Sequence, residues 1–439
     1  MRLHGIRDVR PAGQVIKKKT KEIRKMKKKL DPIYLLFACL CCGAFVVYAI
    51  YVNSFGPNAS LIMKYFNITE SRHGFIITVQ SIGGIITAIW LSLFGERYNK
   101  IYVISLCLAL MAAGSILTGV IPAFFPAGGY MLLLVFVLIA GIGYTGIDVM
   151  MNGVITETYP ERKSTILPVA HAFYSTGAMV APLFVTLTVN AVKAETFSTP
   201  FLLVGILSAV VFAAYLVTGR KIMPSTPYAD MKAFKIRANE NPAEIFRTLR
   251  AWLILFACLL YFSFMYGLSV WMPTFFQQER GLGHQLSGLM STIFFFGALL
   301  MRFVSPLFFR RMQVERFYVV SGILSAVCMS AAFSVGSDLT PVIVLLVFAG
   351  GFLQGANTIA LVMISCNEFP ERTASASAIT VLAFNLAAMS MPLVIGFLAE
   401  RAGFLFPMYL LTLCMAGSVL IIWIGRRFAF RQTSDRKAS

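Results

Sequence analysis

The sequence predicts an all-α membrane protein with twelve transmembrane helices arranged as two related bundles of six. Two observations carry this prediction: apolar runs long enough to cross a bilayer recur along the chain, and one stretch of sequence occurs twice. The composition agrees, because 58% of the 439 residues are hydrophobic and only 13% are charged. Ordinary soluble domains carry about 25% charged residues. The chain is therefore not an ordinary soluble protein.

The apolar runs follow one another from Pro32 to Ile424. Each is about 20 residues long and can cross the roughly 30 Å of hydrocarbon in a bilayer. They lie near residues 33–54, 73–94, 101–121, 130–154, 164–189, 198–219, 251–275, 286–308, 315–335, 341–364, 374–398 and 404–424.

An internal repeat relates the fourth and fifth runs to the tenth and eleventh. The segment Tyr159–Arg162 returns 210 residues later as Phe369–Arg372, with Pro-Glu-Arg identical in both. At the same offset Gly141 corresponds to Gly351. Repeats of this kind build many membrane transport proteins, with a site at the interface of the two halves.

Three polar residues of the repeated stretch, Asp148, Asn152 and His171, occur in the first half only. Their counterparts in the second half are Thr358, Val362 and Val381. Asp148 lies twelve residues before Pro160 and His171 eleven residues after it. Two antiparallel helices rising about 1.5 Å per residue would place both at a similar depth. We therefore expect one polar site in the first half.

Asp148 alone among the nineteen acidic residues lies well inside an apolar run. Intramembrane ionisable residues are costly and are functional candidates by default. A buried carboxyl group can carry a proton at physiological pH. Alternatively, the ionised Asp148 and the oxygen of Asn152 can contribute to a Na⁺ site. His171 can hydrogen-bond Asp148 or a solute, or simply pack between helices. We predict Asp148 and His171 as coupling residues for H⁺ or Na⁺, with no cofactor.

The formal net charge of +19 follows membrane topology. If both termini are cytoplasmic, 32 of the 38 Lys and Arg residues fall on the cytoplasmic side. Such a bias fixes the orientation of membrane proteins. We expect a multi-pass protein of the cell membrane with both termini cytoplasmic, in contact with the lipid bilayer and not with nucleic acid.

A short charged segment between the second and third runs points to a family. Gly95-Glu96-Arg97-Tyr98-Asn99-Lys100 resembles the loop in which an acidic and basic residues clamp cytoplasmic helix ends in the major facilitator superfamily. Glu96 stands where Asp is usual, and Asn99 where Gly is common. Together with twelve runs and an internal repeat, the chain is identified as a member of that superfamily. The resemblance implies a cytoplasmic gate of Glu96, Arg97 and Lys100.

A narrower resemblance covers about forty residues. Asp148-x-x-x-Asn152 and the segment from His171 to Pro182 are similar to the fucose/glucose-type sugar:cation symporter branch, above all its sodium-dependent glucose transporter-like members. That branch usually has Asn three residues before the His, where this chain has Pro168. The resemblance implies a transporter of a small polar solute, a sugar or a sugar-like compound, coupled to H⁺ or Na⁺. The alternatives are a proton-coupled drug or metabolite efflux antiporter and a non-transporting membrane sensor.

Polar and aromatic residues in other runs are further candidates for binding this small-molecule substrate. They are Tyr48, Asn53, Gln80, Tyr261, Tyr266, Gln354, Asn357 and Asn385. The amides can instead join helices, and aromatic residues can form an interfacial belt, which is the interpretation favoured for Trp271. Arg302 is expected to extend to the cytoplasmic surface, because Arg310 follows eight residues later.

The predicted domain order is a basic cytoplasmic arm (1–32), an N-terminal six-helix bundle (33–219), a cytoplasmic linker (220–250), a C-terminal six-helix bundle (251–424) and a cytoplasmic tail (425–439). A monomer is expected. Catalytic residues are not, because the sequence lacks a Ser-His-Asp elbow, a phosphate-binding Gly-Lys loop and Cys/His metal spacing. The chain is therefore predicted not to be an enzyme.

Overall fold

The chain forms twelve membrane-spanning segments, as the sequence predicts. The computed structural model describes residues 32–94, 98–125, 129–158, 163–191, 197–222, 242–369 and 373–430. Within these ranges twelve helical segments are long and apolar enough to cross a bilayer. The first six are α2 (Pro32–Asn53), α4 (Glu70–Phe94), α5 (Lys100–Phe124), α6 (Tyr130–Thr158), α7 (Lys163–Ala191) and α8 (Ser198–Ile222). The second six are α9 (Leu249–Gln278), α10 (His284–Arg311), α11 (Val314–Ser334), α12 with α13 (Thr340–Gln354 and Asn357–Glu368), α14 (Thr373–Ala402) and α15 (Leu405–Phe428).

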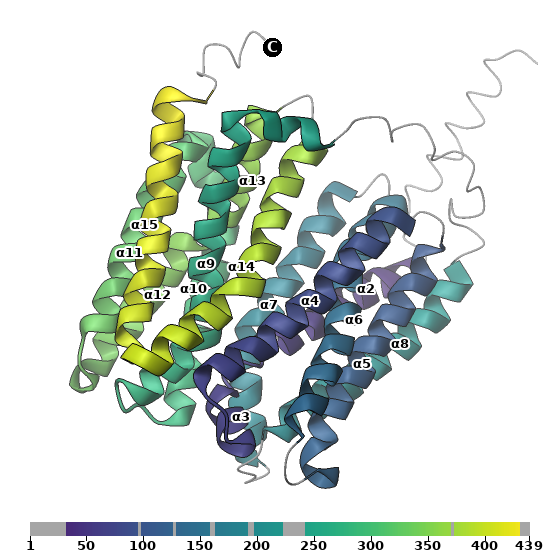
Figure 1. The fold of residues 1–439 in the computed structure, drawn as a ribbon. Helices are drawn as coiled ribbons and strands as arrows, with labels where there is room; N and C mark the ends of the chain where they lie inside the picture. The colour runs from purple at the N-terminus through teal and green to yellow at the C-terminus, as the bar shows by residue number, and fades with distance from the viewer. Residues whose placement is uncertain are drawn as a thin grey trace, which may run out of the picture.

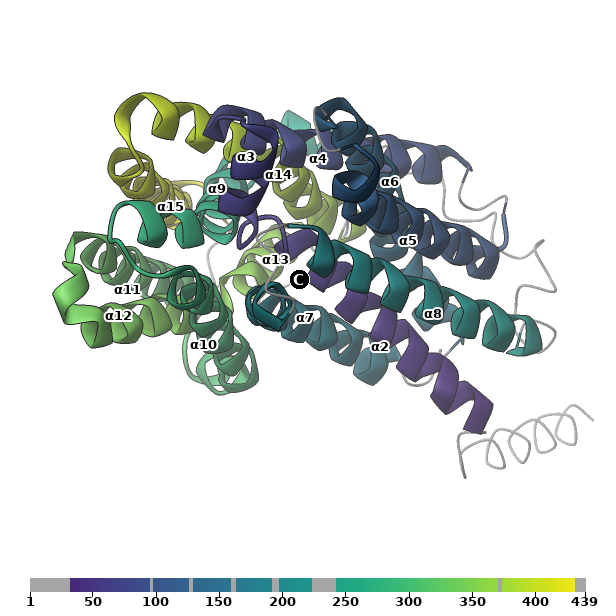
Figure 2. The same ribbon diagram turned by 90° about the horizontal axis from the view of Figure 1, so that it is seen from below.

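The segments are grouped into two bundles that lie side by side. Helices α2 to α8 form one bundle and α9 to α15 the other (Figure 2). A short helix, α3 (Ala59–Phe66), connects α2 to α4. Because twelve segments run alternately up and down, α2 begins and α15 ends at the same end of the molecule, here called the proximal end. The opposite end, where α3 lies, is the distal end (Figure 1).

The two bundles repeat the same close helix contact. Gly141 of α6 lies against the backbone of Gln80 in α4, so closely that a Cβ atom would overlap the Gln80 carbonyl oxygen. In the second bundle Gly351 of α12 lies in the same way against the backbone of Phe294 in α10. Glycine permits this close approach because it has no side chain. The sequence repeat is thus matched by a repeated packing geometry.

A second close helix contact occurs at the same place in both bundles, but the glycine that permits it lies on opposite sides of the contact. In the first bundle Gly84 of α4 faces the side chain of Thr145 in α6. At the corresponding place in the second bundle, Ala298 of α10 faces Gly355, which lies between α12 and α13. A Cβ atom on either glycine would overlap its neighbour. Each contact therefore requires a glycine, but on opposite sides in the two halves.

The outer surface of the helices carries large apolar side chains, as a lipid-facing surface would. Residues more than half exposed include Leu106, Met131, Leu187, Phe303 and Leu345. Such apolar exposure over many helices would be an aggregation liability in water. It therefore fits a multi-pass membrane protein.

The bundles contact each other at the distal end through α4 and α14. The hydroxyl of Thr78 donates a hydrogen bond of 2.7 Å to the backbone oxygen of Met389. Nearby, Gly74 lies so close to Pro392 that a Cβ atom would overlap the backbone oxygen. In Figure 1 the two bundles approach each other toward the lower, distal end and diverge toward the proximal end. The structure is therefore closed distally.

Trp271 of α9 lies within this distal contact. Its side chain is fully buried, and its indole N–H donates a hydrogen bond of 2.9 Å to the backbone oxygen of Pro392. The ring of His73 from α4 packs edge-on against it, with 5.3 Å between centroids. Close by, Ser269 donates a hydrogen bond of 3.0 Å to Asn53. The prediction that Trp271 belongs to an interfacial belt is wrong, because contacts between the bundles exclude it from the surface.

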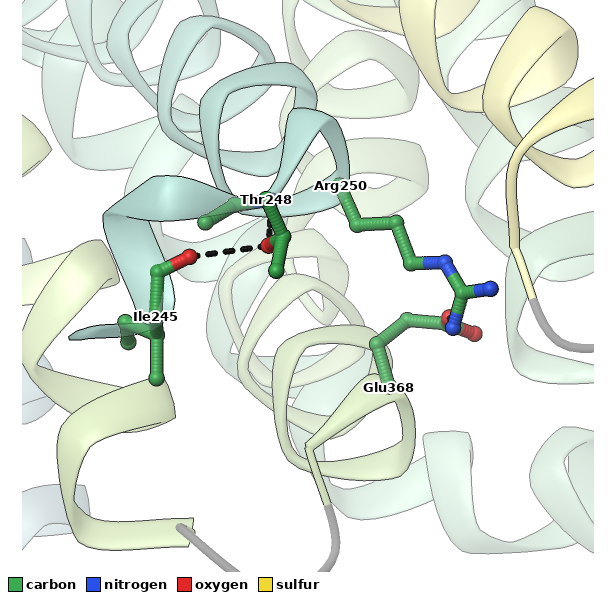
Figure 3. A network of polar contacts seen from close by, with 5 residues as sticks. Ile245, Thr248, Arg250 and Glu368 are labelled. Atoms are coloured by element: carbon green, nitrogen blue, oxygen red, sulfur yellow. Dashed lines mark hydrogen bonds and ion pairs between the residues drawn. The ribbon is translucent and has the colours of Figure 1, made fainter.

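The end of the linker is fixed to the second bundle at the proximal end. A 3₁₀ helix, η4 (Pro242–Arg247), precedes α9. Thr248 donates a hydrogen bond of 2.8 Å to the backbone oxygen of Ile245, and Arg250 forms an ion pair of 3.8 Å with Glu368 at the end of α13 (Figure 3). Arg250 is partly exposed, whereas Glu368 is buried. The ion pair ties the start of α9 to the end of α13.

Candidate functional site

Asp148 lies in the interior of α6 among tyrosines from both bundles. Its side chain is only partly buried although it lies ten residues before the end of the helix at Thr158. The carboxylate is within electrostatic reach of the hydroxyl groups of Tyr48, Tyr144 and Tyr174 in the first bundle and of Tyr266 in the second. These four residues are called the tyrosine cluster below. The accessible part of Asp148 therefore faces the region between the bundles.

Ring packing holds the tyrosine cluster in place. Tyr48 of α2 stacks on Tyr144 of α6 with 5.1 Å between centroids, and it contacts Tyr174 of α7 at 5.0 Å. Tyr266 of α9 packs edge-on against Phe384 of α14 at 5.1 Å. Aromatic pairs with these geometries are favourable beyond the area they bury. Hydroxyl groups from four different helices are thus positioned around one carboxylate.

A second polar cluster lies where the tenth span is interrupted. Helix α12 ends at Gln354 and α13 begins at Asn357, so Gly355 and Ala356 form a break. The hydroxyl of Tyr261 on α9 donates a hydrogen bond of 2.9 Å to Gln354 and lies 2.9 Å from the hydroxyl of Thr358. Thr358 is the repeat counterpart of Asp148. Interrupted helices are typical of the solute sites of transport proteins.

Arg302 of α10 joins this second cluster. Its Nε donates a hydrogen bond of 3.2 Å to the backbone oxygen of Gly355. Its guanidinium group is also within electrostatic reach of the hydroxyls of Tyr261 and of Tyr174 from the first bundle. The prediction that Arg302 extends to the cytoplasmic surface is wrong, because the break in the tenth span offers it a carbonyl oxygen inside the bundle.

Two of the predicted amides, Asn53 and Gln80, lie at close contacts between helices. Asn53 accepts the hydrogen bond from Ser269 across the two bundles, and its side-chain nitrogen donates one of 2.8 Å to the backbone oxygen of Ala49. Gln80 is buried beside Gly141, and its Nε2 has no hydrogen-bond partner within the described ranges. Asn53 is thus engaged in the distal contact, while Gln80 retains an unused donor.

The amides of the second half have different surroundings. Asn357 is fully buried and accepts a hydrogen bond of 2.7 Å from Ser321 of α11, which directs it into the second bundle. Asn385 of α14 is partly exposed and donates a hydrogen bond of 3.0 Å to Val381, one turn before it in the same helix. Neither of these two hydrogen bonds involves Asp148, and the predicted solute-binding roles of Asn357 and Asn385 stay predictions.

Several predicted residues lie outside the described part of the chain. Glu96 and Arg97, two residues of the predicted cytoplasmic gate, fall between α4 and α5, outside the described ranges. The side chains of Asn152 and His171 are likewise outside the description, although their backbones belong to α6 and α7. Their predicted roles in coupling, Na⁺ binding and gating stay predictions.

Lys100, the third predicted gate residue, is buried at the start of α5. Asn99 directly before it caps this helix, since its side-chain oxygen accepts a hydrogen bond of 2.9 Å from the backbone N–H of Ile101. Asparagine is a favoured N-cap residue. This local role gives a physical reason for the Asn at a position where the family often has Gly.

Sequence reasoning missed three members of the two clusters: Tyr144, Tyr174 and Thr358. Tyr144 could have been found, because it lies four residues before Asp148 and so on the same helix face. Thr358 could have been found as the repeat counterpart of Asp148. Tyr174 carried no such signal, since only the packing of α7 directs it toward both clusters.

The described residues contain no group of three His, Cys, Asp or Glu side chains that could hold a metal ion. The eight cysteines, all within the described ranges, are free thiols. The chemistry of the candidate site is thus that of one carboxylate, one guanidinium, several phenolic hydroxyls and amides, which can bind a polar solute and exchange a proton.

Two bundles of six helices, related by an internal repeat and meeting around an intramembrane polar site, define a secondary transporter fold. Comparison with known families agrees: the Major Facilitator Superfamily model matches residues 36–316 and 281–438. The chain belongs to this superfamily. A similar curated protein is the uncharacterized MFS-type transporter YfkL of Bacillus subtilis (strain 168), which is 21% identical over 359 residues, covering 79% of this chain and 84% of that protein.

Solved structures of several transporters share the fold. A D-xylose–proton symporter superposes with a TM-score of 0.70 at 13% identity, covering 92% of this chain and 99% of that one. The nucleoside transporter NupG gives 0.69 at 16% identity, covering 91% and 100%. A bacterial homologue of the human lysosomal transporter Spinster, solved inward-facing and occupied, gives 0.69 at 16% identity, covering 90% and 96%. At these identities the likeness establishes the fold and leaves the substrate open.

Proposed function

We propose that the protein is a secondary active transporter that moves a small polar solute, a sugar or a sugar-like compound, in symport with H⁺ or Na⁺. The observation that carries this proposal is the position of Asp148. A partly accessible carboxylate inside a membrane span, surrounded by hydroxyls from both bundles, suits a group that binds a cation in one state and releases it in another. The structural relatives that carry xylose with a proton, or nucleosides, support a polar solute.

Alternating access gives these clusters their proposed roles. The distal contact of α4 with α14 would close the site on one side, leaving it open toward the proximal end. If the proximal end is cytoplasmic, as the charge distribution predicts, the structure corresponds to an inward-facing state. Transport then requires the bundles to rock, which opens the distal contact and closes the proximal one. Tyr266 would follow the second bundle and change its distance from Asp148.

The site residues divide into coupling and solute-binding groups under this proposal. Asp148, with His171, would bind the coupling ion, and Asn152 would assist if that ion is Na⁺. Tyr48, Tyr261, Tyr266 and Gln354 would bind solute hydroxyls, since phenols and amides both donate and accept hydrogen bonds.

Proton-coupled efflux of an organic cation is the second candidate. The tyrosine cluster favours it, because aromatic faces beside a carboxylate attract cations. Arg302 weighs against it, since a guanidinium near the same tyrosines repels a cationic solute. A labelled lipophilic cation therefore belongs in the same uptake experiment.

The test is uptake into proteoliposomes under an imposed H⁺ or Na⁺ gradient. Wild type should accumulate a member of a labelled hexose and pentose panel, and Asp148→Asn should lower the accumulation ratio to about 1 because it removes the ion-binding charge. Asp338→Asn is the matched control, since Asp338 lies exposed in the distal turn before α12. Full accumulation by Asp148→Asn would contradict the coupling role, and cation extrusion without sugar uptake would favour efflux.

A further inference from the structure

Arg302 is a cation inside the membrane span that the proposed coupling mechanism does not use. It lies nine residues before the end of α10 at Arg311, which is about 14 Å along a helix axis. Of its five N–H donors, only Nε donates a hydrogen bond within the described part of the chain, to Gly355. Within the described part of the chain, Arg250 forms an ion pair with Glu368, and no described carboxylate lies within ion-pair distance of Arg302.

The remaining donors are accessible to a solute. The Arg302 side chain is partly exposed, and its guanidinium is within electrostatic reach of Tyr261 from its own bundle and Tyr174 from the other. The exposed part therefore faces the region between the bundles, where Asp148 also lies. An intramembrane cation is costly to keep without a counter-charge, and arginine matches a carboxylate with two parallel hydrogen bonds.

The surroundings of Arg302 supply partners for hydroxyl groups as well. Tyr261, Gln354 and Thr358 form a chain of hydrogen bonds directly beside Gly355, the residue that holds Nε. Helix α13 also begins here, and the N-terminal end of a helix favours negative charge. Thr358 is partly exposed, whereas Tyr261 and Gln354 are buried and hold it in place. A ligand that fits Arg302 and Thr358 together is a small hydroxylated molecule with one carboxylate.

We propose that Arg302 binds a carboxylate of the transported solute, so that the substrate is a sugar acid or a similar hydroxylated organic anion rather than a neutral sugar. This inference rests on the proposed transport function and specifies its substrate class. The simpler alternative is that Arg302 has a structural role only, which is to cap the carbonyl oxygen of Gly355 with a hydrogen bond. Four spare N–H donors near the partly exposed residues Thr358 and Tyr174 exceed what such a cap requires.

The inference has a consequence for charge movement. A monovalent organic anion that binds Arg302 travels with the one cation that neutralises Asp148, whether H⁺ or Na⁺. The charges of solute and coupling ion then cancel. Symport should therefore be driven by the ion gradient and be indifferent to membrane potential.

The experiment compares charged and neutral probes of one shape. Wild-type proteoliposomes are assayed for uptake of labelled glucuronate, gluconate, glucose and glucuronamide, the last being the neutral counterpart of glucuronate. We expect glucuronate or gluconate uptake at least tenfold above that of the neutral probes, with no change when a valinomycin potential is imposed. Arg302→Gln should lower this uptake at least tenfold, and Arg302→Lys should restore part of it, because it keeps the charge but not the paired donors.

Other outcomes separate the two proposals. Equal uptake of glucose by wild type and Arg302→Gln, without acid uptake, would overturn the carboxylate site and leave the transporter standing. No gradient-driven uptake of any probe by wild type would overturn both. Arg302→Gln must elute as a monodisperse peak with an unchanged Tm. If it does not, ligand-induced thermal stabilisation of wild type by glucuronate but not glucuronamide decides the question.

Discussion

At the scale of single residues, Tyr174 is the side chain that connects the two charged groups of the site. Its hydroxyl is within electrostatic reach of Asp148 in its own bundle and of Arg302 in the other. Its ring packs against Tyr48 at 5.0 Å. A hydroxyl in this position can donate to the carboxylate or accept from the guanidinium, because it does both. A change in the charge of Asp148 can therefore alter the interaction of the Tyr174 hydroxyl with Arg302.

We predict that Tyr174→Phe weakens transport without unfolding the protein. Removing the hydroxyl deletes its hydrogen bonds but preserves the ring contact, and such a loss is worth about 0.5–1.5 kcal/mol. The KM for the transported solute should therefore rise by up to roughly tenfold. Tyr409→Phe is the control, because its hydroxyl contacts Ser334 at 2.6 Å far from Asp148. Equal effects of the two variants would contradict the connecting role of Tyr174.

Sequence reasoning reached the site only in part, for reasons visible at this scale. Asp148 could be singled out because an acid inside an apolar run is costly and therefore rare. Tyrosines inside such runs are common, so composition alone could not distinguish Tyr174 from Tyr102, which is exposed near the start of α5. Arg302 was assigned to the surface because its distance from Arg310 in sequence does not reveal which helix face it occupies. The side chains of Asn152 and His171 lie outside the description, so their part in the site stays a prediction.

At the scale of elements, the interrupted tenth span combines packing and polarity. Gly355 lies so close to the backbone of Ala298 that α10 and the break are in direct contact. The carbonyl oxygen of the same glycine accepts the hydrogen bond from Arg302. The twelve spans and their repeat were predictable from hydropathy and matching residues. The break was not, because Gly355-Ala356 also suits a continuous membrane helix and only the approach of α10 explains it.

We predict that Gly355→Ala destabilises the protein, because the new methyl group would overlap backbone atoms that cannot rotate away. Overpacking of this kind costs about 1–3 kcal/mol, which thermal unfolding in detergent would record as a lower Tm. Gly43→Ala in α2 is the matched control. A Cβ atom there has no neighbour within 4 Å, and alanine favours helix more than glycine does. A Tm unchanged or raised in both variants would contradict the close contact.

At the scale of the whole molecule, the distal contact closes one end of the region between the bundles. It is built from close backbone approaches, such as Gly74 against Pro392, and from the buried pair of His73 and Trp271. Close packing of this kind has discrete arrangements rather than a continuous range, so the bundles are expected to switch between closed and open contacts. The state seen here would be one end of the transport cycle.

We predict that Gly74→Leu holds the distal end open, since the larger side chain cannot fit against the α14 backbone. Trp271 supplies the measurement, because it is fully buried while Trp90, Trp252 and Trp423 are each more than 40% exposed. In a background with those three replaced by Phe, Gly74→Leu should increase quenching of Trp271 by iodide several-fold. Gly43→Leu, which has open space, should not. Equal quenching in all variants would place the opening elsewhere.

The glycines at the repeated contact, Gly84 in the first bundle and Gly355 in the second, predict a pattern of substitutions in related sequences. Gly84 faces Thr145 in the first bundle, whereas Ala298 faces Gly355 in the second. After an ancestral duplication, a larger residue could replace glycine on one helix of this contact only while the facing position remained glycine. Positions 84 and 145 should therefore covary, as should 298 and 355, each pair keeping one glycine. Exchanging the pairs between the halves would place a threonine at position 355. Its hydroxyl would then lie beside the carbonyl oxygen that accepts the hydrogen bond from Arg302.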